Sequence, residues 1–391
     1  MGRLADGRAI FVPYALPGER VLVEIVEQKA HHAFGKLLNV LEASPQRIPA
    51  RCAHFGECGG CHYQHLPYEE QVSLKAKLLA EQLQRIGGLH DLPSIQIHPS
   101  PLPWHYRNSL QFHLTSAGKP GFQRAQSHET LAIEECFLPL EPLVDLWKQI
   151  EIDPGSGVER VVLRCDSAEN ILLILESQSP LTPEVLIEEL PLSVVHLSPA
   201  GSLVIAGSEH LWMDVKGQRL RLSAGAFFQV NLAVAEQIIE FLLSHLEFSN
   251  SDTLLDVYCG GGLYSLFLAP KVKRLIGIES SPHACRDFEV NLDAFDHVEL
   301  YEADAEQVLP SLNLQPQIIL LDPPRSGLSK IVRQSLWQLA PPQIAYVSCD
   351  PATFARDARY FAQNGYRLEH LAFFDMFPQT YHIEALGIWQ G

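Results

Sequence analysis

The second half of the chain repeats one pattern, in which a short apolar stretch ends beside reactive or ligand-binding residues and a helix-like stretch follows. Residues 343–348 lead into Cys349, residues 317–321 lead into Asp322, and residues 253–258 lead into a glycine-rich loop. Strands that alternate with helices form parallel sheets, and the carboxyl ends of parallel strands share one edge. The pattern therefore predicts an α/β domain with a thiol and an acid at that edge.

The limits of this α/β domain follow from the same pattern. We expect its first helix at residues 230–246. No helix separates the strand-like residues 368–374 from residues 383–389, which predicts an antiparallel hairpin that closes the sheet. We assign residues 227–391 to a doubly wound, Rossmann-like domain.

The first half of the chain predicts two further domains. Residues 1–45 contain strand-like stretches separated by turns, so we predict a small barrel of oligonucleotide-binding type at residues 1–48, with or without a ligand. Residues 49–226 form a central, mixed β-rich domain in this interpretation. It includes a helix at about residues 68–88 that could pack on the α/β domain.

Size and composition narrow the class of protein. A chain of 391 residues is too long for one ordinary core. No apolar run approaches the length of a membrane span, and the first residues lack an apolar signal region, so we expect a cytoplasmic location and no membrane partner. The eight cysteines should then stay reduced, and clustered ones should be metal ligands or catalysts.

The net charge of −17 argues at first against a nucleic-acid partner. The charge is unevenly distributed, however. Residues 1–125 carry 13 Lys and Arg against 10 Asp and Glu, whereas the rest of the chain carries 16 against 36. If RNA is bound, we therefore expect the N-terminal part to make most of the phosphate contacts.

The glycine-rich loop after the first strand of the α/β domain predicts a nucleotide-like cofactor. Gly260 is the first of three consecutive glycines, which let the backbone approach a ligand closely. Glu279 ends the next strand, where an acid can bind ribose hydroxyls. The loop has Ser265 where a dinucleotide fingerprint needs Gly or Ala, and Asp256 just before it would repel a pyrophosphate. These features favour S-adenosylmethionine over NAD, and Asp304 is placed to meet the adenine amino group.

The thiol of Cys349 and the acids Asp322 and Glu384 are together suited to methylation of uracil at C5. Addition of a thiolate to C6 activates C5, an acid can hold the pyrimidine edge, and a base removes the C5 proton afterwards. A free cysteine has a pKa of about 8.5, so the site must favour the thiolate. Arg325 or Arg356 can do so, and the sequence does not choose between them. The remaining isolated cysteines, at positions 165, 259 and 285, are expected to fill the core.

Three cysteines in a glycine-rich segment, together with a distant fourth, predict a metal centre. They are Cys52, Cys58, Cys61 and Cys136. Tetrahedral thiolate sites suit zinc or an iron–sulfur cluster, and spacing alone does not decide between them. Aromatic residues between positions 95 and 125, such as Trp104, His105, Tyr106 and Phe112, either stack on RNA bases or fill a β core.

Five motifs together resemble the S-adenosylmethionine-dependent RNA (uracil-5-)-methyltransferases of the RumA/TrmA type. They occur in family order across the whole α/β domain: Phe-Phe-Gln-Val-Asn at 227–231, Asp-Val-Tyr-Cys-Gly at 256–260, Asp-Pro-Pro-Arg-Ser-Gly at 322–327, Val-Ser-Cys-Asp-Pro at 347–351, and Phe-Asp-Met-Phe-Pro-Gln-Thr-Tyr-His-Ile-Glu at 374–384. One departure is Leu263, where members often carry Asn or Thr, so a cofactor contact through that side chain is not expected here.

The resemblance implies a role for each matching residue. Cys349 would be the nucleophile, Glu384 the base that removes the C5 proton, and Asp322 a contact to the target uracil. The cofactor S-adenosylmethionine would be lined by Gln229, Tyr258, Gly260, Glu279, Asp304 and Asp322.

The resemblance also extends to the N-terminal half. It implies that the four cysteines bind a [4Fe-4S] cluster and that residues 11–19 belong to a TRAM RNA-binding module. The expected substrate is a uridine in structured RNA, either tRNA or 23S ribosomal RNA, and the expected state is a monomer. The alternative function is a metal-stapled RNA-binding protein on a non-catalytic methyltransferase fold.

Overall fold

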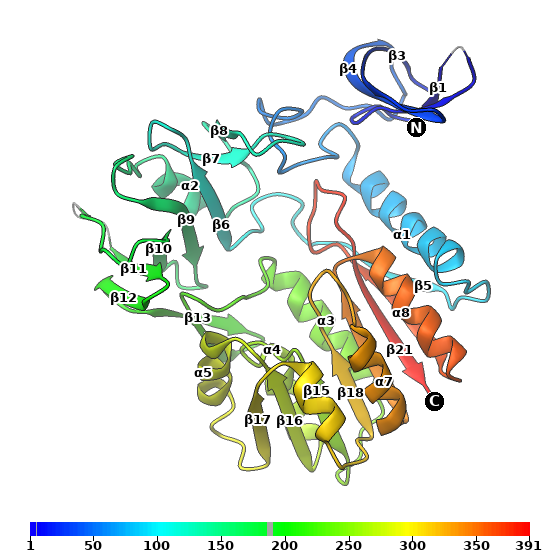
Figure 1. Ribbon diagram of the computed structural model, residues 1–391, viewed down its shortest axis with the longest axis vertical. Helices are drawn as coiled ribbons and strands as arrows, with labels where there is room; N and C mark the ends of the chain where they lie inside the picture. The colour runs from blue at the N-terminus through cyan, green and yellow to red at the C-terminus, as the bar shows by residue number, and fades with distance from the viewer. Residues whose placement is uncertain (5, 186–190) are drawn as a thin grey trace.

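A computed structural model describes residues 1–4, 6–185 and 191–391 of the chain (Figure 1). Its largest sheet has eight strands in the order β17-β16-β15-β18-β19-β21-β20-β5. The strands are β15 (Thr253–Val257), β16 (Arg274–Glu279), β17 (Val298–Glu302), β18 (Ile318–Leu321), β19 (Gln343–Ser348), β20 (Arg367–Phe374), β21 (Glu384–Gln390) and β5 (Ile95–His98).

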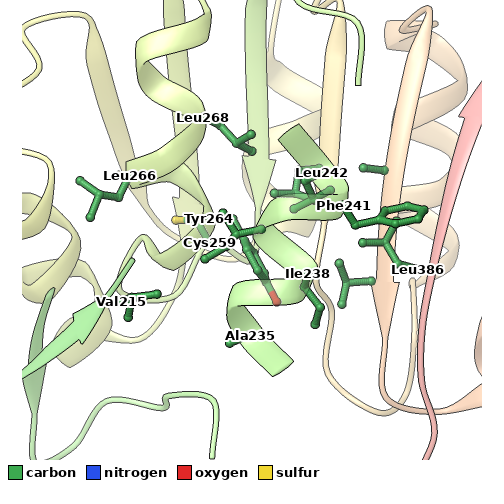
Figure 2. Packing of buried hydrophobic residues seen from close by; sticks show 14 of the residues in the cluster. Val215, Ala235, Ile238, Phe241, Leu242, Cys259, Tyr264, Leu266, Leu268 and Leu386 are labelled. Atoms are coloured by element: carbon green, nitrogen blue, oxygen red, sulfur yellow. The ribbon is translucent and has the colours of Figure 1, made fainter. Parts of the chain in front are cut away.

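Helices cover both faces of this sheet because successive strand residues point to opposite sides. Leu254 and Leu320 belong to one hydrophobic cluster, whereas their neighbours Leu255 and Leu321 belong to the other. Figure 2 shows part of the first cluster, where helix side chains pack on the strands. Helices on the first face are α3 (Leu232–His245), α4 (Leu263–Leu268) and α5 (Pro282–Asn291), and those on the second are α1 (Tyr68–Arg85), α6 (Ala305–Val308), α7 (Lys330–Leu339) and α8 (Pro351–Gln363).

The predicted doubly wound fold with a closing hairpin is confirmed. Strands β17, β16, β15, β18 and β19 are parallel, as alternation of strand and helix requires. Strand β21 lies between β19 and β20 and is antiparallel to both. The first residue of β21, Glu384, is therefore at the edge where the parallel strands end.

Two elements from the first half of the chain complete the α/β unit. Strand β5 pairs in parallel with β20 and forms the last strand of the sheet. Helix α1 packs beside α8, and its side chains Val72, Leu79 and Leu83 share a hydrophobic cluster with Phe354 and Phe361. The sequence pattern placed residues 95–98 in the central region instead. That assignment was wrong because local alternation identifies a strand but not the sheet that it joins.

The predicted all-β character of the N-terminal region is also confirmed. Its four strands form one sheet in the order β1-β2-β4-β3. They are β1 (Gly2–Arg3), β2 (Ala9–Phe11), β3 (Arg20–Gln28) and β4 (His32–Glu42). None of the helices in the described ranges is both long and apolar enough to cross a membrane.

The central region contains a seven-stranded sheet in the order β12-β11-β10-β9-β6-β7-β8, beside the short helix α2 (Glu141–Trp147). Its strands are β6 (Ser109–Leu114), β7 (Pro120–Gln123), β8 (Thr130–Ala132), β9 (Val158–Cys165), β10 (Ile171–Ser177), β11 (Leu192–Ser198) and β12 (Gly201–Ala206). The hairpin of β13 (His210–Val215) and β14 (Gln218–Ser223) instead packs into the cluster that contains α3. The domain limits at residues 48 and 226 stay predictions.

A buried ion pair joins α1 to the loop between β20 and β21. Lys75 Nζ lies 2.6 Å from Asp375 Oδ1, and both side chains have 0% exposure. Lys75 Nζ also donates a hydrogen bond to the Phe377 carbonyl at 3.0 Å. Burial lowers the pKa of Lys75, and the Asp375 charge opposes that shift. Removing one partner would leave the other charge buried without compensation.

We predict that Lys75→Met lowers the free energy of unfolding by about 3–5 kcal/mol, because Asp375 is left unpaired in the interior. Urea denaturation of the full chain measures this change. Lys77→Met, at an exposed position on the same helix, is the matched control and should change stability little. Equal effects of the two substitutions would show that the ion pair does not hold the loop to α1.

Candidate active site

Cys349 lies where β19 ends and α8 begins, and it is half-buried. The Asp350 side chain accepts hydrogen bonds from the backbone N–H groups of Ala352 at 3.0 Å and Thr353 at 2.8 Å. An Asp cap followed by Pro in the first turn defines where a helix starts. The local sequence Ser-Cys-Asp-Pro therefore holds the thiol at the junction between strand and helix.

Strand register brings the two acids to the same edge. Ser348 is opposite Ala385 in the β19–β21 pair, so Cys349 and Glu384 adjoin this pair at the same end. Glu384 is 3% exposed. Asp322 follows β18, the other neighbour of β19, and its backbone N–H donates to the Val257 carbonyl at 3.3 Å. The structure thus brings together the three residues that the sequence predicted as catalytic.

The environment of Cys349 favours the neutral thiol. Burial raises its pKa to about 11, and the charges of Glu384 and Asp322 add to this effect. Arg325 acts in the opposite direction. Arg356, the other candidate for stabilising a thiolate, is instead bound to Asp357 at 2.9 Å through both Nε and Nη2. Of the two arginines, Arg325 is therefore the one whose charge lowers the pKa of the Cys349 thiol.

The pKa values of the two acids are also raised. Burial raises the pKa of Glu384 well above its ordinary range, with a further contribution from Asp322 and an opposing one from Arg325. Burial and the charge of Asp256 raise the pKa of Asp322 to about 7. Carboxyl groups with such high pKa values exchange protons readily near neutral pH, which general acid–base chemistry needs.

The glycine-rich loop after β15 has the backbone geometry of a ligand cradle. Tyr258, Gly260 and Gly262 all have positive φ angles, of 67°, 54° and 85°. A Cβ atom at Gly262 would lie 2.4 Å from a methyl carbon of Leu292, so this position requires glycine. Glycine at 262 therefore lets the loop pack against the end of α5, whereas a Cβ atom at Gly260 would meet no other heavy atom within 4 Å.

The predicted cofactor residues surround this loop. Glu279 ends β16, and its carboxylate accepts hydrogen bonds from the N–H groups of Gly260 at 3.0 Å and of Ser280 and Ser281 at 2.8 Å each. Asp304 is exposed at the start of α6, and its side chain makes no capping bond there. Burial raises the pKa of the Tyr258 phenol, and the charges of Glu306, Asp357 and, least of the three, Asp304 add to this shift.

Gln229 is the remaining predicted cofactor residue, and it lies in the segment before α3. It is buried, and its carbonyl accepts a hydrogen bond from the Asn108 side chain at 3.0 Å. This bond ties the segment to the start of the central sheet. Asp322 has a place in both predicted groups, because it follows β18 beside β15 and β19.

Asp256, which precedes the glycine-rich loop, does not have the exposed charge that its position predicts. Asp256 was expected to present a negative charge to the loop, but it has 0% exposure and its Oδ2 accepts a hydrogen bond from Ser265 Oγ at 2.6 Å. Burial raises its pKa to about 7, so the charge is weakened at neutral pH. Electrostatic repulsion by Asp256 therefore does not discriminate strongly between S-adenosylmethionine and NAD.

Sequence reasoning missed Tyr264, the second residue of α4. Its side chain is buried beside Cys259, Ile238 and Leu242 (Figure 2). Burial raises the pKa of the phenol, and the charges of Asp322, Glu384 and Asp256 add to the shift. Tyr264 therefore lies within electrostatic range of all three acids. The helical pattern alone could not distinguish it from an ordinary core aromatic.

The four predicted cysteine ligands line one cleft between the N-terminal sheet and the central region. The cleft has a volume of about 1670 Å³. Its lining includes the basic side chains Lys36, Arg47, Arg107 and Arg124. Burial raises the pKa of Cys61 to about 12, and the charges of Cys136 and Cys58 contribute. The cysteines are thus electrostatic neighbours although the fourth is far away in sequence.

The spacing of the four cysteines allows two kinds of metal centre, zinc and an iron–sulfur cluster. In residues 1–4, 6–185 and 191–391, no group of three or more His, Cys, Asp or Glu side chains has an arrangement that could hold a metal ion. Neither centre is therefore preformed by these thiols in the described residues. Their common cleft supplies four soft ligands, a type of donor that suits zinc as well as an iron–sulfur cluster.

Two of the aromatic residues that were predicted either to stack on RNA bases or to fill a β core lie in the core. Phe112 has 0% exposure and stacks on Phe122 and Trp147. Tyr106 is also buried, and its hydroxyl donates to the Pro378 carbonyl at 3.1 Å. Their rings are therefore not available for stacking on bases.

The fold and this edge of the sheet define a class: an α/β methyltransferase fold with an added N-terminal β module. Two family models match parts of this chain, and both matches agree with this class. Residues 206–390 match the tRNA (Uracil-5-)-methyltransferase model, and residues 1–38 match the TRAM domain model.

Full-length relatives and a solved structure narrow the class further. An uncharacterized RNA methyltransferase of Halalkalibacterium halodurans is 32% identical over 98% of this chain and 92% of its own length. One of Aquifex aeolicus is 35% identical over 98% and 93%. The fold also matches the Pyrococcus abyssi tRNA (uracil-54, C5)-methyltransferase in complex with S-adenosyl-L-homocysteine, with a TM-score of 0.77, 23% identity, and coverage of 99% and 98%. This chain belongs to the TRAM-containing family of RNA (uracil-5-)-methyltransferases.

The electrostatics of the site predict how Cys349 responds to substitution of its neighbours. In Glu384→Gln, loss of a negative charge lowers the pKa of the thiol, so Cys349 should react faster with iodoacetamide at pH 9 than in the unaltered protein. In Arg325→Gln the pKa rises further and the reaction should slow. Mass spectrometry of the peptide that contains Cys349 measures both rates.

The exposed Glu302 provides a control, since Glu302→Gln should leave the reaction rate of Cys349 unchanged. If Glu384→Gln and Arg325→Gln change the rate in the same direction, the electrostatic assignment of the two residues is wrong.

Proposed function

We propose that this enzyme transfers a methyl group from S-adenosylmethionine to C5 of a specific uridine in structured RNA through a covalent bond between Cys349 and C6. The observation that carries the proposal is the juxtaposition of Cys349, Glu384 and Asp322 at one sheet edge, next to a glycine-rich loop. A thiol, a base and a polar contact are the groups that methylation of uracil at C5 requires.

Each of the three residues has one role in the proposed reaction. Cys349 adds to C6 of the uracil, which places an electron pair on C5 and O4. Asp322 binds the pyrimidine edge. When bound, S-adenosylmethionine supplies the electrophilic methyl group that C5 accepts. Glu384 then removes the C5 proton, the electrons of that C–H bond re-form the C5–C6 double bond, and the bond from sulfur to C6 breaks.

Proton transfer explains why these side chains are buried together. Burial raises the pKa of the thiol to about 11, so its proton must pass to solvent water as sulfur attacks. Arg325 stabilises the thiolate that forms. Burial makes Glu384 a stronger base once it is ionised, because its conjugate acid has a raised pKa. The target base must leave its stack to reach these groups, at a cost of a few kcal/mol.

The cofactor pocket in this proposal is formed by the residues around the glycine-rich loop. Glu279 binds the ribose hydroxyls, since its carboxylate is held in place by three backbone N–H groups. Asp304 contacts the adenine amino group beside Tyr258. Gln229 and Asp322 line the methionine side, and Gly260 provides room for it.

We also propose that Cys52, Cys58, Cys61 and Cys136 hold a [4Fe-4S] cluster. The support is the common cleft, its four thiols and its basic lining. The cluster would order the cysteine segment and thereby shape the cleft in which RNA binds. The proposed substrate is tRNA or 23S ribosomal RNA, and the structural neighbour from Pyrococcus abyssi is a tRNA (uracil-54, C5)-methyltransferase. We propose a monomer located in the cytoplasm.

The covalent mechanism predicts distinct effects for the two central residues. Cys349→Ala should abolish transfer of tritiated methyl groups to RNA, and Glu384→Gln should slow product formation by about 10²- to 10⁴-fold. RNA that contains 5-fluorouridine should form an adduct with the unaltered enzyme because fluorine cannot leave as a proton.

Cys165→Ala, a change at a cysteine of the central sheet, is the control and should still form the adduct. An adduct that persists in Cys349→Ala would refute the nucleophile. Absence of methyl transfer to any RNA by the unaltered chain would favour the alternative, a non-catalytic RNA-binding protein. Mapping 5-methyluridine in RNA from cells with and without the gene identifies the substrate.

The proposed cluster predicts a coloured protein. Anaerobically purified enzyme should show brown absorbance and contain iron and sulfide, and Cys58→Ala should lose the colour and bind RNA more weakly. Cys285→Ala, in α5, is the control. Unaltered enzyme without iron would rule out the cluster, whereas normal RNA binding by colourless Cys58→Ala would rule out its role in shaping the cleft.

A further inference from the structure

The loop at residues 375–383 joins β20 to β21 and ends at Glu384, the proposed base. We infer that Gln379 is a positioning residue that holds this loop, and through it Glu384, by binding the cysteine segment and α1 at once. The inference rests on the proposed function and deepens it. It assigns the N-terminal cysteine segment a part in proton removal. That part depends on backbone hydrogen bonds to the loop, which a segment that only contacted RNA would not need.

Gln379 uses both its backbone and its side chain. Its carbonyl accepts hydrogen bonds from the N–H groups of His62 at 2.8 Å and Tyr63 at 3.0 Å, directly after Cys61. Its N–H donates to Gln71 Oε1 at 3.1 Å, and its Oε1 accepts from Gln71 Nε2 at 3.0 Å. Its Nε2 donates to the Pro103 carbonyl at 3.4 Å. One residue thus contacts three segments that are about 275 to 320 positions away in the chain.

Gln379 adopts a backbone conformation that its surroundings must enforce. Its φ is 68°, in the left-handed region that side-chain-bearing residues rarely occupy, and it is 2% exposed. Such a conformation persists where the surrounding contacts over-determine it, and it is common near functional sites. The two hydrogen bonds between Gln379 and Gln71, one from the backbone and one from the side chain, supply that constraint from α1.

The rest of the loop is held from the same elements. Asp375 pairs with Lys75 of α1, and its N–H donates to the His98 carbonyl at 2.9 Å. The Tyr106 hydroxyl donates to the Pro378 carbonyl at 3.1 Å. In Figure 1 the loop projects from β21 toward the chain that precedes α1. The path to Glu384 is therefore fixed at its start and at its middle by residues outside the hairpin.

The base needs such external support because its nearest acidic neighbour repels it. Glu384 must be ionised to remove a proton, and Asp322 raises its pKa, which means that the two negative charges disfavour each other. A hairpin end without anchors would let the carboxylate move away from Asp322 and from the C5 proton. The anchors at the start and the middle of the loop oppose that movement.

The test compares Gln379→Met and Gln71→Met, which keep the side-chain volume. Gln379→Met removes the hydrogen bond between the two side chains, and Gln71→Met removes that bond together with the one from the Gln379 backbone N–H. Gln363→Met, at an exposed position near the end of α8, is the matched control. For each full-length variant we would measure kcat, KM, the steady-state fraction of enzyme in the Cys349–RNA adduct on denaturing gels, binding of S-adenosylmethionine, and the melting temperature.

We expect kcat to fall by about 10- to 100-fold in both variants while KM is unchanged, because misplacement by about 1 Å can cost 10²-fold. Proton removal becomes slower than adduct formation, so the adduct should accumulate relative to the unaltered enzyme. The double substitution should be less harmful than the sum of the two single ones, because both remove the hydrogen bond between the two side chains.

An unchanged kcat overturns the inference. So does a loss of kcat with an equal loss of adduct, or with weaker cofactor binding and lower melting temperature, since these indicate a general folding defect. If the unaltered enzyme makes no 5-methyluridine, the proposed function fails instead, and that result is distinct from each of these outcomes.

Discussion

The chemistry of this enzyme depends on one pairing, the insertion of β21 between β19 and β20 in the opposite direction. Parallel strands deliver Cys349 and Asp322 at their carboxyl ends. An antiparallel strand presents its first residue at the same edge, and here that residue is Glu384. A parallel last strand would carry its first residue to the far end of the sheet. The direction of one strand therefore decides whether the Cys349 thiol and the Glu384 carboxyl group lie at the same edge of the sheet.

That arrangement concentrates negative charge in a buried place. Asp256, Asp322 and Glu384 all have raised pKa values, and each shift is caused first by burial. Arg325 opposes the shifts of Glu384 and of Cys349. Burial of like charges is unfavourable for folding, so this edge of the sheet relies on the surrounding packing for its stability.

Most of the α/β unit could be predicted from the sequence, because short stretches of neighbouring residues indicate its strands and helices. Apolar runs of strand length, each followed by a helix, indicate the parallel sheet, and the residues after those runs fall at one edge whatever the loops do. Cys349 and Asp322 could be found in this way. Glu384 required the further step that two strands without a helix between them form a hairpin.

What could not be predicted depends on contacts between distant segments. Strand β5 has an ordinary alternating sequence, and nothing in that sequence indicates that it pairs with β20. Gln71 and Gln379 are 308 positions apart, and each is an unremarkable glutamine until the fold joins them. The burial of Asp256 behind Ser265 likewise follows from packing and not from its position before a glycine-rich loop. Which distant segments pair in the folded chain cannot be read from the spacing of residues along the sequence.

The position of β5 has a consequence for modularity. The family match begins at residue 206, yet the sheet takes its edge strand from residues 95–98 and its second face takes α1 from residues 68–85. A chain that started at residue 206 would have an open hydrogen-bonding edge on β20 and an uncovered apolar surface on α8, which are features that promote aggregation. The residues that match the family model and the residues that fold together are thus different sets. The methyltransferase domain therefore cannot be exchanged between proteins by simple fusion or recombination at residue 206.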